Sequence, residues 1–436
     1  MLSKRKVTIA GLLVLMLCGI FVGVVQAQEK VELTMSVWGM PWEDKLYTDF
    51  AIPQFEAKYP HIKVNFVRFE DYWNQLLIRH AGGNAPDVMR NADEDFGQMR
   101  MRGALHPLTS YVEASNLDLS DFHDIAIDAL TVDGELWALP QDLSPRNLLY
   151  YNKAMFDEAG ISYPTADWTL EDLVDAAKKL TKGSRPRVQQ WGITWSEAHF
   201  LSTAMLGFGG ELWDENGRSV VAGEGNVAGI EWIQSLVFEH GVAPNYLEVD
   251  PGNTLDLFKG ERSAMHINGG WSVPAVARDV PDLDFGVVPL PKPLSTVLGQ
   301  CIWTMSSQTE YPDEAWLLIE FLSSYDVLRE YWQLTWVAAP ARLSVIFSDD
   351  FSKITGVEGH VPAITDPQRL QDLTGFWDVL IGDDRFTQDH VHPYYGVLKN
   401  TFLEPYSDEL FGATPADAAA ILQTIQDGVN SEIDAF

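Results

Sequence analysis

The first regular pattern in the chain is an alternation of apolar and polar residues from Leu33 to Val37, which ends at Trp38. A period of two is typical of a strand with one buried face, and a second such run covers residues 62–66. Helical patterns follow, at residues 54–59 after a proline and at residues 71–81, and residues 85–89 resemble a third strand. Strands that alternate with helices predict an α/β fold with a mostly parallel sheet between layers of helices.

Further patterns continue this mixture to the C-terminus. Asp133-Gly134 between two apolar runs predicts a hairpin, and residues 148–151 predict a buried strand. Thr169 with Asp172 predicts the capped start of a helix, and Thr414-Pro415 predicts the start of the last helix. With 436 residues and no repeat or long flexible linker, the chain is expected to form two lobes that it crosses between more than once.

The N-terminus has the pattern of an export signal. Lys4, Arg5 and Lys6 precede an almost wholly apolar run at residues 7–25, and small residues before Gln28 provide a cleavage site. Residues 1–27 are therefore expected to be a signal peptide that places the rest of the chain in the periplasm or elsewhere outside the cytoplasm. The apolar run approaches the length of a membrane span, so an uncleaved N-terminal anchor is the alternative.

The charge of the chain narrows the choice of partners. It has 62 acidic and 30 basic residues, a net charge of −32, and loss of residues 1–27 would change this to −35. Such a charge opposes binding to nucleic acid or to anionic membranes. Cys301 is the only cysteine after the expected signal, so no internal disulfide is expected there.

Motifs for catalysis or for cofactors are weak. There is no phosphate-binding Walker loop, nucleophile elbow or zinc-protease helix. Residues 223–228 fit a dinucleotide pattern but are interpreted as the entry turn of a helix. Residues 91–95 resemble the start of a calcium loop, but Phe96 and Arg102 replace its glycine and glutamate. His390 and His392 have no third ligand nearby, so they do not indicate a metal site. From all these motifs together, we expect no cofactor, no metal site and no catalytic residue.

Aromatic residues provide the stronger signal, because the acidic chain contains 15 Trp and 14 Tyr. A sugar has C–H faces that stack on flat rings, and hydroxyl groups that bond to carboxylates, amides and Arg. Trp38, Trp195 and Trp271 each follow an apolar run, and open α/β sheets bind ligands just beyond their strand ends. The alternative for each is an ordinary place in the core.

Four segments, in order, resemble one known family. They are Phe55 with Pro60 and residues 62–64, residues 85–88, residues 149–161, and residues 258–271, which end at Trp271. Together they are similar to the extracellular solute-binding proteins of sugar-importing ABC transporters, the group that contains maltose-binding protein. This resemblance implies the two-lobed periplasmic-binding-protein fold of type II, with a ligand cleft between lobes joined by hinge strands. It implies residues 28–143 plus 289–326 for the N-terminal lobe, and 144–288 plus 327–436 for the C-terminal lobe.

The resemblance also implies function. The chain would be the substrate-binding subunit of a carbohydrate importer. It would capture a di- or oligosaccharide by hinge closure and deliver it to a transmembrane permease, as a monomer and without catalysis. A secreted glycoside hydrolase, and a binding protein for an amino sugar or polyol derivative, are the alternatives.

The resemblance gives ligand-binding candidates at several positions. Trp271 lies on the family motif and is expected to stack on a sugar ring. Glu94 and Asp95 replace the Asp-Arg pair of the maltose-type pattern, which argues against maltose specificity. The full set of candidates is Trp38, Trp42, Glu43, Asn91, Asp93, Glu94, Asp95, Trp195, Glu197, His199, Trp271, Tyr394 and Tyr395.

Overall fold

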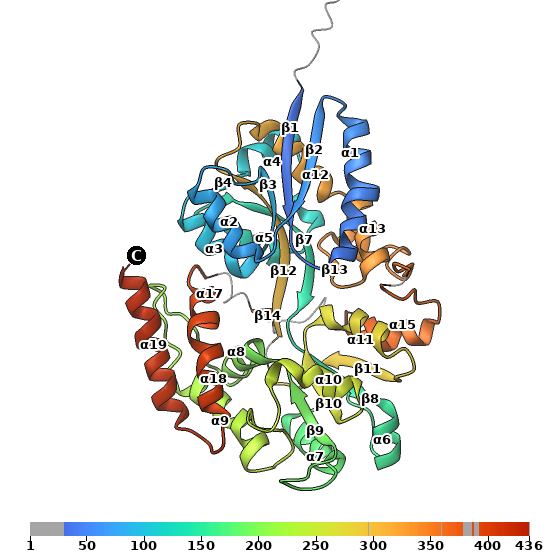
Figure 1. Cartoon of the computed structure of the whole chain (residues 1–436), viewed down its shortest axis with the longest axis vertical. Coiled ribbons are helices and arrows are strands. Elements are labelled where there is room, and N and C mark those ends of the chain that lie inside the picture. The colour runs from blue at the N-terminus through green and yellow to red at the C-terminus, as the bar shows by residue number, and fades with distance from the viewer. Residues whose placement is uncertain (1–29, 295, 359, 378–385, 388–391, 436) are drawn as a thin grey trace, which may run out of the picture.

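In the computed structural model, the chain forms two lobes, each built on its own β-sheet (Figure 1). The structure describes residues 30–294, 296–358, 360–377, 386–387 and 392–435. The expected export signal, residues 1–27, lies outside this part. No helix among the described residues is long and apolar enough to cross a bilayer.

The sheet of the first lobe has the order β13-β7-β12-β3-β1-β2, and β4 and β14 pair with β12 outside this path. Strand β1, next to the edge strand β2, is parallel to both β2 and β3, whereas β12 is antiparallel to β3 and to β7. The sheet is therefore mixed, and the prediction of a mostly parallel sheet was wrong for it. Its strands are β1 (Val31–Val37), β2 (Ile62–Arg68), β3 (Val88–Ala92), β4 (Leu105–His106), β7 (Ala138–Pro145), β12 (Thr296–Ser306), β13 (Ala339–Pro340) and β14 (Phe386–Thr387).

Helices cover this first sheet. Apolar side chains of the sheet, such as Leu33 and Met35 of β1, pack against apolar side chains of the helices and have no exposed surface. The helices are η1 (Pro41–Glu43), η2 (Leu46–Ala51), α1 (Ile52–Lys58), α2 (Tyr72–Ala81), α3 (Asp93–Met101), α4 (Thr109–Ser115), η3 (Leu119–Asp121), α5 (Asp124–Leu130), α12 (Pro312–Leu322), α13 (Tyr325–Thr335) and α14 (Leu343–Ile346). A short hairpin of β5 (Thr131–Val132) and β6 (Glu135–Leu136) turns at Asp133-Gly134, as predicted.

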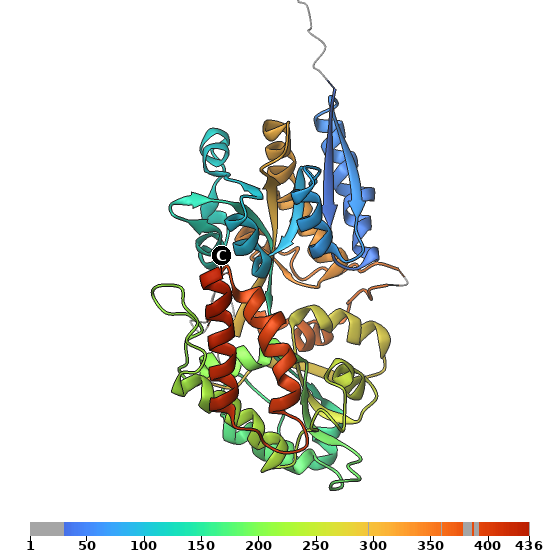
Figure 2. The same ribbon diagram turned by 60° about the vertical axis from the view of Figure 1, so that its left-hand side comes forward.

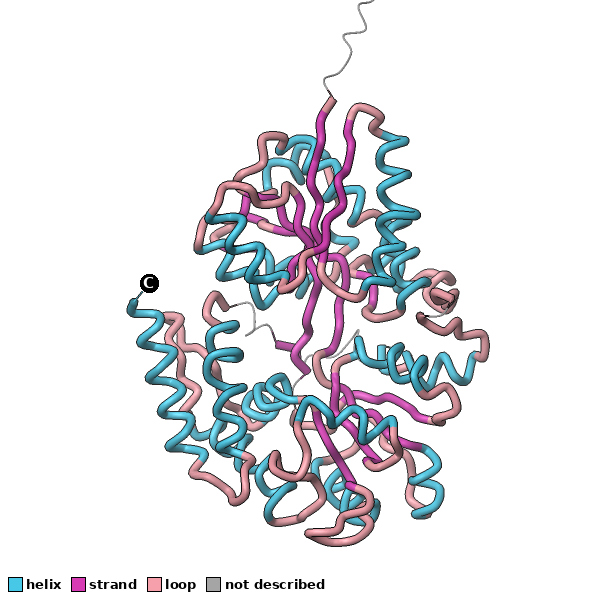
Figure 3. Tube along the Cα trace, in the orientation of Figure 1, coloured by secondary structure: helices cyan, strands magenta, loops and turns pink. Residues whose placement is uncertain are grey.

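The second sheet has the order β11-β8-β10-β9. Its strands are β8 (Leu148–Asn152), β9 (Trp191–Trp195), β10 (Ser263–Asn268) and β11 (Phe285–Pro289). Every residue of β8, β9 and β10 is buried, which is typical of a strand covered on both faces. Figure 3 shows these strands enclosed by helices of the lower lobe.

The helices of the second lobe come from the middle and the end of the chain. They are α6 (Lys153–Ala159), α7 (Leu170–Leu180), α8 (Glu197–Gly207), α9 (Glu224–Phe238), η4 (Pro251–Asn253), α10 (Thr254–Lys259), η5 (Gly270–Ser272), α11 (Val273–Asp279), α15 (Pro367–Thr374), α17 (Tyr395–Val397), η7 (Leu398–Leu403), α18 (Glu404–Leu410) and α19 (Ala418–Ala435). Figure 2 shows α18 and α19 side by side on one flank of this lobe.

Local chemistry explains most element boundaries. Thr169 and Asp172 form the predicted capping box at the start of α7. The third strand begins at Val88 rather than at residue 85, because Pro86 has no N–H to donate and the Asp87 carboxylate accepts instead from Thr34 N at 2.8 Å. The last helix begins at Ala418, three residues after the predicted start at Pro415.

The chain passes between the lobes at short crossing segments. It leaves β7 at Pro145 and enters β8 at Leu148, and it returns between β11 and β12. Helix α13 packs against η2 and β13 of the first lobe, and Tyr331 donates to Asp142 of β7 at 2.8 Å. We therefore propose that the last crossing follows β13, later than the expected boundary at residue 327.

The start of α3 touches the C-terminal elements of the second lobe. Lys399 Nζ lies 3.4 Å from the Glu94 carboxylate, and α17 packs against α3. Asp95 lies beside this ion pair, partly buried. Burial and the neighbouring Glu94 carboxylate raise the pKa of Asp95 from 3.8 to about 7, although Lys399 opposes the shift.

This shift predicts that Asp95→Asn stabilises the fold at pH 8. The unfolded chain loses the Asp95 proton near pH 3.8 and the folded chain holds it until near pH 7, so the carboxyl group lowers stability as the pH rises through this window. We expect a gain in the free energy of unfolding of up to about 4 kcal/mol at pH 8, and less than half of that at pH 5. Urea unfolding followed by circular dichroism would measure both values.

Asp128→Asn is the matched control, because this aspartate is exposed on α5 and its loss changes the net charge equally. A gain for Asp95→Asn that equals the control at both pH values would contradict the burial argument.

Candidate functional site

A cavity of about 510 Å³ lies between the lobes, a volume in the range of small-molecule sites. Its wall combines the loop after β1, the start of α3, the crossing segment after β7, the helix α11, and parts of β12 and α13. The lining residues are Trp38, Gly39, Met40, Trp42, Glu43, Arg90, Ala92, Glu94, Asp142, Ser144, Arg146, His199, Trp271, Pro274, Ala275, Arg278, Gly299, Gln300, Cys301, Tyr331, Val337 and Ala338.

Helix α11 and the turn before it form the wall on the second lobe. Trp271, Pro274, Ala275 and Arg278 follow the i, i+3, i+4, i+7 spacing that places side chains on one helical face, and all four line the cavity. Trp271 is 37% exposed, whereas most large apolar side chains of the chain are buried. Its indole ring packs directly over Gly269, where a Cβ atom would lie only 2.3 Å from the ring.

The loop after β1 forms the facing wall on the first lobe. Trp38 is partly buried against Trp73, with ring centroids 5.4 Å apart, and Trp42 follows in η1. Gly39 adopts φ = +115°, a backbone conformation that favours glycine, and the Glu43 carboxylate fills the space where its side chain would be. The loop therefore folds back on itself and directs its aromatic residues to the cavity.

Arg90 joins three segments at the floor of the cavity. Its guanidinium lies 3.6 Å from the Glu43 carboxylate and 3.4 Å from that of Asp142, and it donates to the Trp38 carbonyl at 2.9 Å. Tyr331 also donates to Asp142. Burial raises the pKa of both Glu43 and Asp142, and the Arg90 charge opposes this shift.

Arg146 forms a second charged cluster in the crossing segment between the lobes. It donates to Asp93 at 2.6 Å and to Glu94 at 3.4 Å, and lies 3.3 Å from His199 Nε2. The other Asp93 oxygen accepts from the backbone N–H of Gln300 on β12 at 2.8 Å. The cluster thus connects α3, both crossing strands and the second lobe.

The charges on the cavity wall balance each other. Three carboxylates (Glu43, Glu94 and Asp142) and three guanidinium groups (Arg90, Arg146 and Arg278) line it. The whole chain has a net charge of −32, but the charged side chains that line the cavity sum to zero. Within the described part of the chain, no group of three or more His, Cys, Asp and Glu side chains is arranged to hold a metal ion.

The structure brings six of the predicted ligand-binding residues to this cavity. They are Trp38, Trp42, Glu43, Glu94, His199 and Trp271. His199 meets Trp271 edge to face, with ring centroids 6.1 Å apart. Their contact with a ligand remains a prediction.

Other predicted ligand-binding residues lie elsewhere. Asn91 is buried and donates to Thr304 at 2.6 Å, and Asp93 lies beneath Arg146. Trp195 and Tyr395 are 3% and 1% exposed in the core of the second lobe. Trp195 ends β9 and packs into the helix layer, and Tyr395 begins α17 with its side chain in the same core. Asp95 and Tyr394 are not on the cavity wall either: Asp95 contributes to the contact between α3 and the C-terminal elements, and Tyr394 lies beside His392. The side chain of Glu197 is outside the described part, so its place stays a prediction.

Several lining residues were not anticipated, mainly Arg90, Asp142, Arg146, Arg278 and Gln300. A signal for one of them exists in the sequence, because Arg90 directly follows the apolar Val88-Met89 of the expected third strand, whereas Asp142 and Arg146 lie in a polar stretch. A charge in a buried strand needs a partner or a function, and here each has a buried ion-pair partner.

Comparison with known proteins supports this architecture. The structure of a substrate-binding protein from Listeria monocytogenes in complex with cycloalternan is 23% identical, has a TM-score of 0.77, and matches 93% of this chain and 100% of that chain. A maltose/maltodextrin-binding domain from Bdellovibrio bacteriovorus, bound to maltotriose, is 18% identical with a TM-score of 0.72, over 92% of this chain and 100% of that one. The predicted two-lobed periplasmic-binding-protein fold is thereby confirmed.

Sequence relatives agree. A multiple sugar-binding protein of Streptococcus mutans is 22% identical over 304 residues, which is 65% of this chain and 69% of that protein. A Brucella abortus protein described as a binding protein is 25% identical over 281 residues, 62% of this chain and 67% of that protein. The family model for bacterial extracellular solute-binding proteins matches residues 42–327. Since that match covers most of the chain, the protein belongs to the family of bacterial extracellular solute-binding proteins.

Proposed function

We propose that this protein captures a neutral di- or oligosaccharide in the cleft and delivers it to the permease of an ABC importer. The observation that carries the proposal is the wall formed by η5 and α11, where Trp271, which is 37% exposed, and the Arg278 guanidinium both line the cavity. An indole ring suits the C–H face of a sugar, and a guanidinium donates to its hydroxyl groups. The sugar-bound state of the structural neighbours supports the same class of ligand.

The balanced charge of the wall favours a neutral ligand over an amino sugar or a phosphorylated polyol. Each carboxylate on the wall already has an arginine partner within 3.6 Å. A cationic ligand would have to compete with Arg90 or Arg146 for these groups and would leave a buried guanidinium without its partner. Hydroxyl groups can instead accept from or donate to the ion pairs without separating them.

Delivery to a permease places the protein outside the cytoplasm, in agreement with the family and with the expected signal at residues 1–27. We propose that it acts as a monomer, because a ligand held between two lobes of one chain needs no second copy. Closing of the lobes around the sugar would be the change that the permease detects.

Trp271→Ala should weaken sugar binding by at least about 30-fold, or about 2 kcal/mol, since it removes a stacking surface from the centre of the site. A thermal-shift screen with malto-, cello-, manno- and arabino-oligosaccharides identifies the ligand, and isothermal titration calorimetry then measures its affinity. Tyr311→Ala is the matched control, because Tyr311 is also 37% exposed but lies at the start of α12, away from the cavity. Equal affinities for both variants would remove Trp271 from the site.

Gly269→Ala should weaken binding without removing any aromatic group. The added methyl would lie 2.3 to 2.4 Å from the Trp271 ring, so the ring must move from its place over the backbone. Gly269 has φ = −69°, which alanine adopts readily, so the backbone itself is not strained. We expect a loss of about tenfold in affinity with an unchanged melting temperature of the free protein, measured by calorimetry and by differential scanning fluorimetry. Unchanged affinity would show that the position of the ring is not important.

A glycoside hydrolase would cleave the sugars that a binding protein only holds, so incubation with oligosaccharides distinguishes the two functions. Hydrolysis requires one protonated and one ionised carboxyl group on either side of the scissile bond. All three carboxylates of the wall are instead paired with guanidinium groups. We expect a stoichiometric thermal shift with no shortened product after prolonged incubation, as judged by chromatography; turnover of any oligosaccharide would overturn the proposal.

A further inference from the structure

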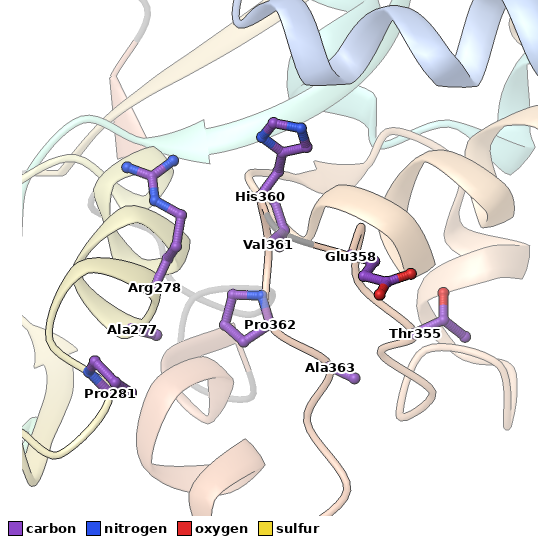
Figure 4. Close-up of a pocket in the computed structure, with 9 residues that line it drawn as sticks. All are labelled: Ala277, Arg278, Pro281, Thr355, Glu358, His360, Val361, Pro362 and Ala363. Atoms are coloured by element: carbon purple, nitrogen blue, oxygen red, sulfur yellow. The ribbon is translucent and has the colours of Figure 1, made fainter.

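A second cavity, of about 480 Å³, shares Arg278 with the cleft. It lies between α11 and the loop of residues 355–358 and 360–363 (Figure 4). The lining residues are Ala277, Arg278, Pro281, Thr355, Glu358, His360, Val361, Pro362 and Ala363.

Arg278 belongs to the walls of both cavities. Pro274 and Ala275 of α11, with Trp271 in the preceding turn η5, face the cleft. Ala277 and, just beyond the helix, Pro281 line the second cavity. Arg278 lies on the ridge between these faces, because it follows Trp271 by seven residues and precedes Pro281 by three. The two cavities therefore lie on either side of the Arg278 side chain.

The loop that forms the other wall is held in place by its backbone. Val357 and Val361 exchange N–H···O bonds of 2.9 and 2.8 Å, and Thr355 N donates to the Gln333 carbonyl of α13 at 2.8 Å. The indole N–H of Trp336 donates to the Pro362 carbonyl at 3.2 Å. The second cavity is therefore formed before any ligand arrives, which reduces the entropy lost on binding.

The chemistry of this cavity matches that of the cleft. The rings of Pro281 and Pro362 provide apolar C–H surfaces, while Arg278 and His360 extend in the same direction from opposite sides of the hollow (Figure 4). The Arg278 Nε donates to Asp279 at 2.7 Å, and among the described residues its two Nη groups have no hydrogen bond. Glu358 adds an exposed carboxylate that accepts from hydroxyl groups.

We infer that this second cavity is a subsite for the far end of the same ligand, which is therefore a neutral oligosaccharide long enough to extend from Trp271 past Arg278. The inference rests on the proposed function and extends it. The two cavities together offer about 1,000 Å³, so a disaccharide fills the cleft alone and a longer chain occupies both.

The test compares two ligand lengths with a variant confined to the second cavity. Glu358→Ala/His360→Ala removes two exposed polar side chains that do not line the cleft. Glu239→Ala/His240→Ala, at the end of α9, removes the same residue types far from either cavity and serves as the matched control. Calorimetry would measure affinities for malto-, cello- and manno-oligosaccharides of two and of five units.

We expect the unaltered protein to bind the pentasaccharide of the preferred series at least tenfold more tightly than the disaccharide. The Glu358/His360 variant should lose most of this advantage and keep its affinity for the disaccharide. Equal affinity for both lengths, or a variant that behaves as the control does, would overturn the subsite while the sugar-binding function stands. Absence of binding for every sugar would overturn the proposed function itself, and the subsite with it.

Discussion

Two buried arginines hold the cleft together. Arg90 and Arg146 are 2% and 6% exposed, and each contacts carboxylates from segments that are distant in sequence. A guanidinium cannot lose its proton inside a protein, so its burial is tolerated only while the carboxylates and carbonyls around it stay in place. Removing one partner of such a pair costs about 3 to 5 kcal/mol, because the remaining charge stays buried. The positions of η1, α3, β7 and β12 relative to each other are thus fixed by the need to pair these two charges.

The two arginines differ in the parts of the molecule that their ion pairs connect. Arg90 and Asp142 lie on strands of the first sheet, and Tyr331 of α13, which packs against the same sheet, bonds to Asp142. Arg146 lies in the crossing segment itself and bonds to α3 on one side and lies beside His199 of the second lobe on the other. Gly299 on β12 packs so closely against the Arg146 guanidinium that a Cβ there would lie 2.8 Å from Nε. The Arg146 guanidinium thus contacts α3, β12 and the second lobe at once, and the missing side chain of Gly299 allows it to lie against β12.

Much of the fold could be predicted from the sequence, because its signals are local. The alternation at β1, the Asp-Gly turn between β5 and β6, and the capping box of α7 depend on neighbouring residues only, and the structure bears them out. The cleft could be predicted only in part. Trp271 and the loop after β1 were found because they follow strand ends, yet the same rule wrongly suggested a place on the cavity wall for Trp195, whose ring is buried against Phe200 and Phe411. The direction of a side chain at a strand end depends on the helices packed over it, and one sequence does not contain that information.

The same limit explains why the ion pairs were missed. Arg90 is separated by 47 residues from Glu43 and by 52 from Asp142, so their contact depends on the order of the strands in the sheet. Once that order is known, a charge in a buried strand has few possible partners, and the sheet order β7-β12-β3-β1 brings all of them to one edge. The cleft is therefore a consequence of topology. The side chains that give the cleft its chemistry break the hydrophobic pattern of the chain. They are charged residues in strands that are otherwise apolar, and Trp271, which is exposed although most large apolar side chains are buried. Leaving an indole ring 37% exposed forgoes part of the stabilisation that its burial would give, and a ligand that stacked its apolar face on this ring would restore it.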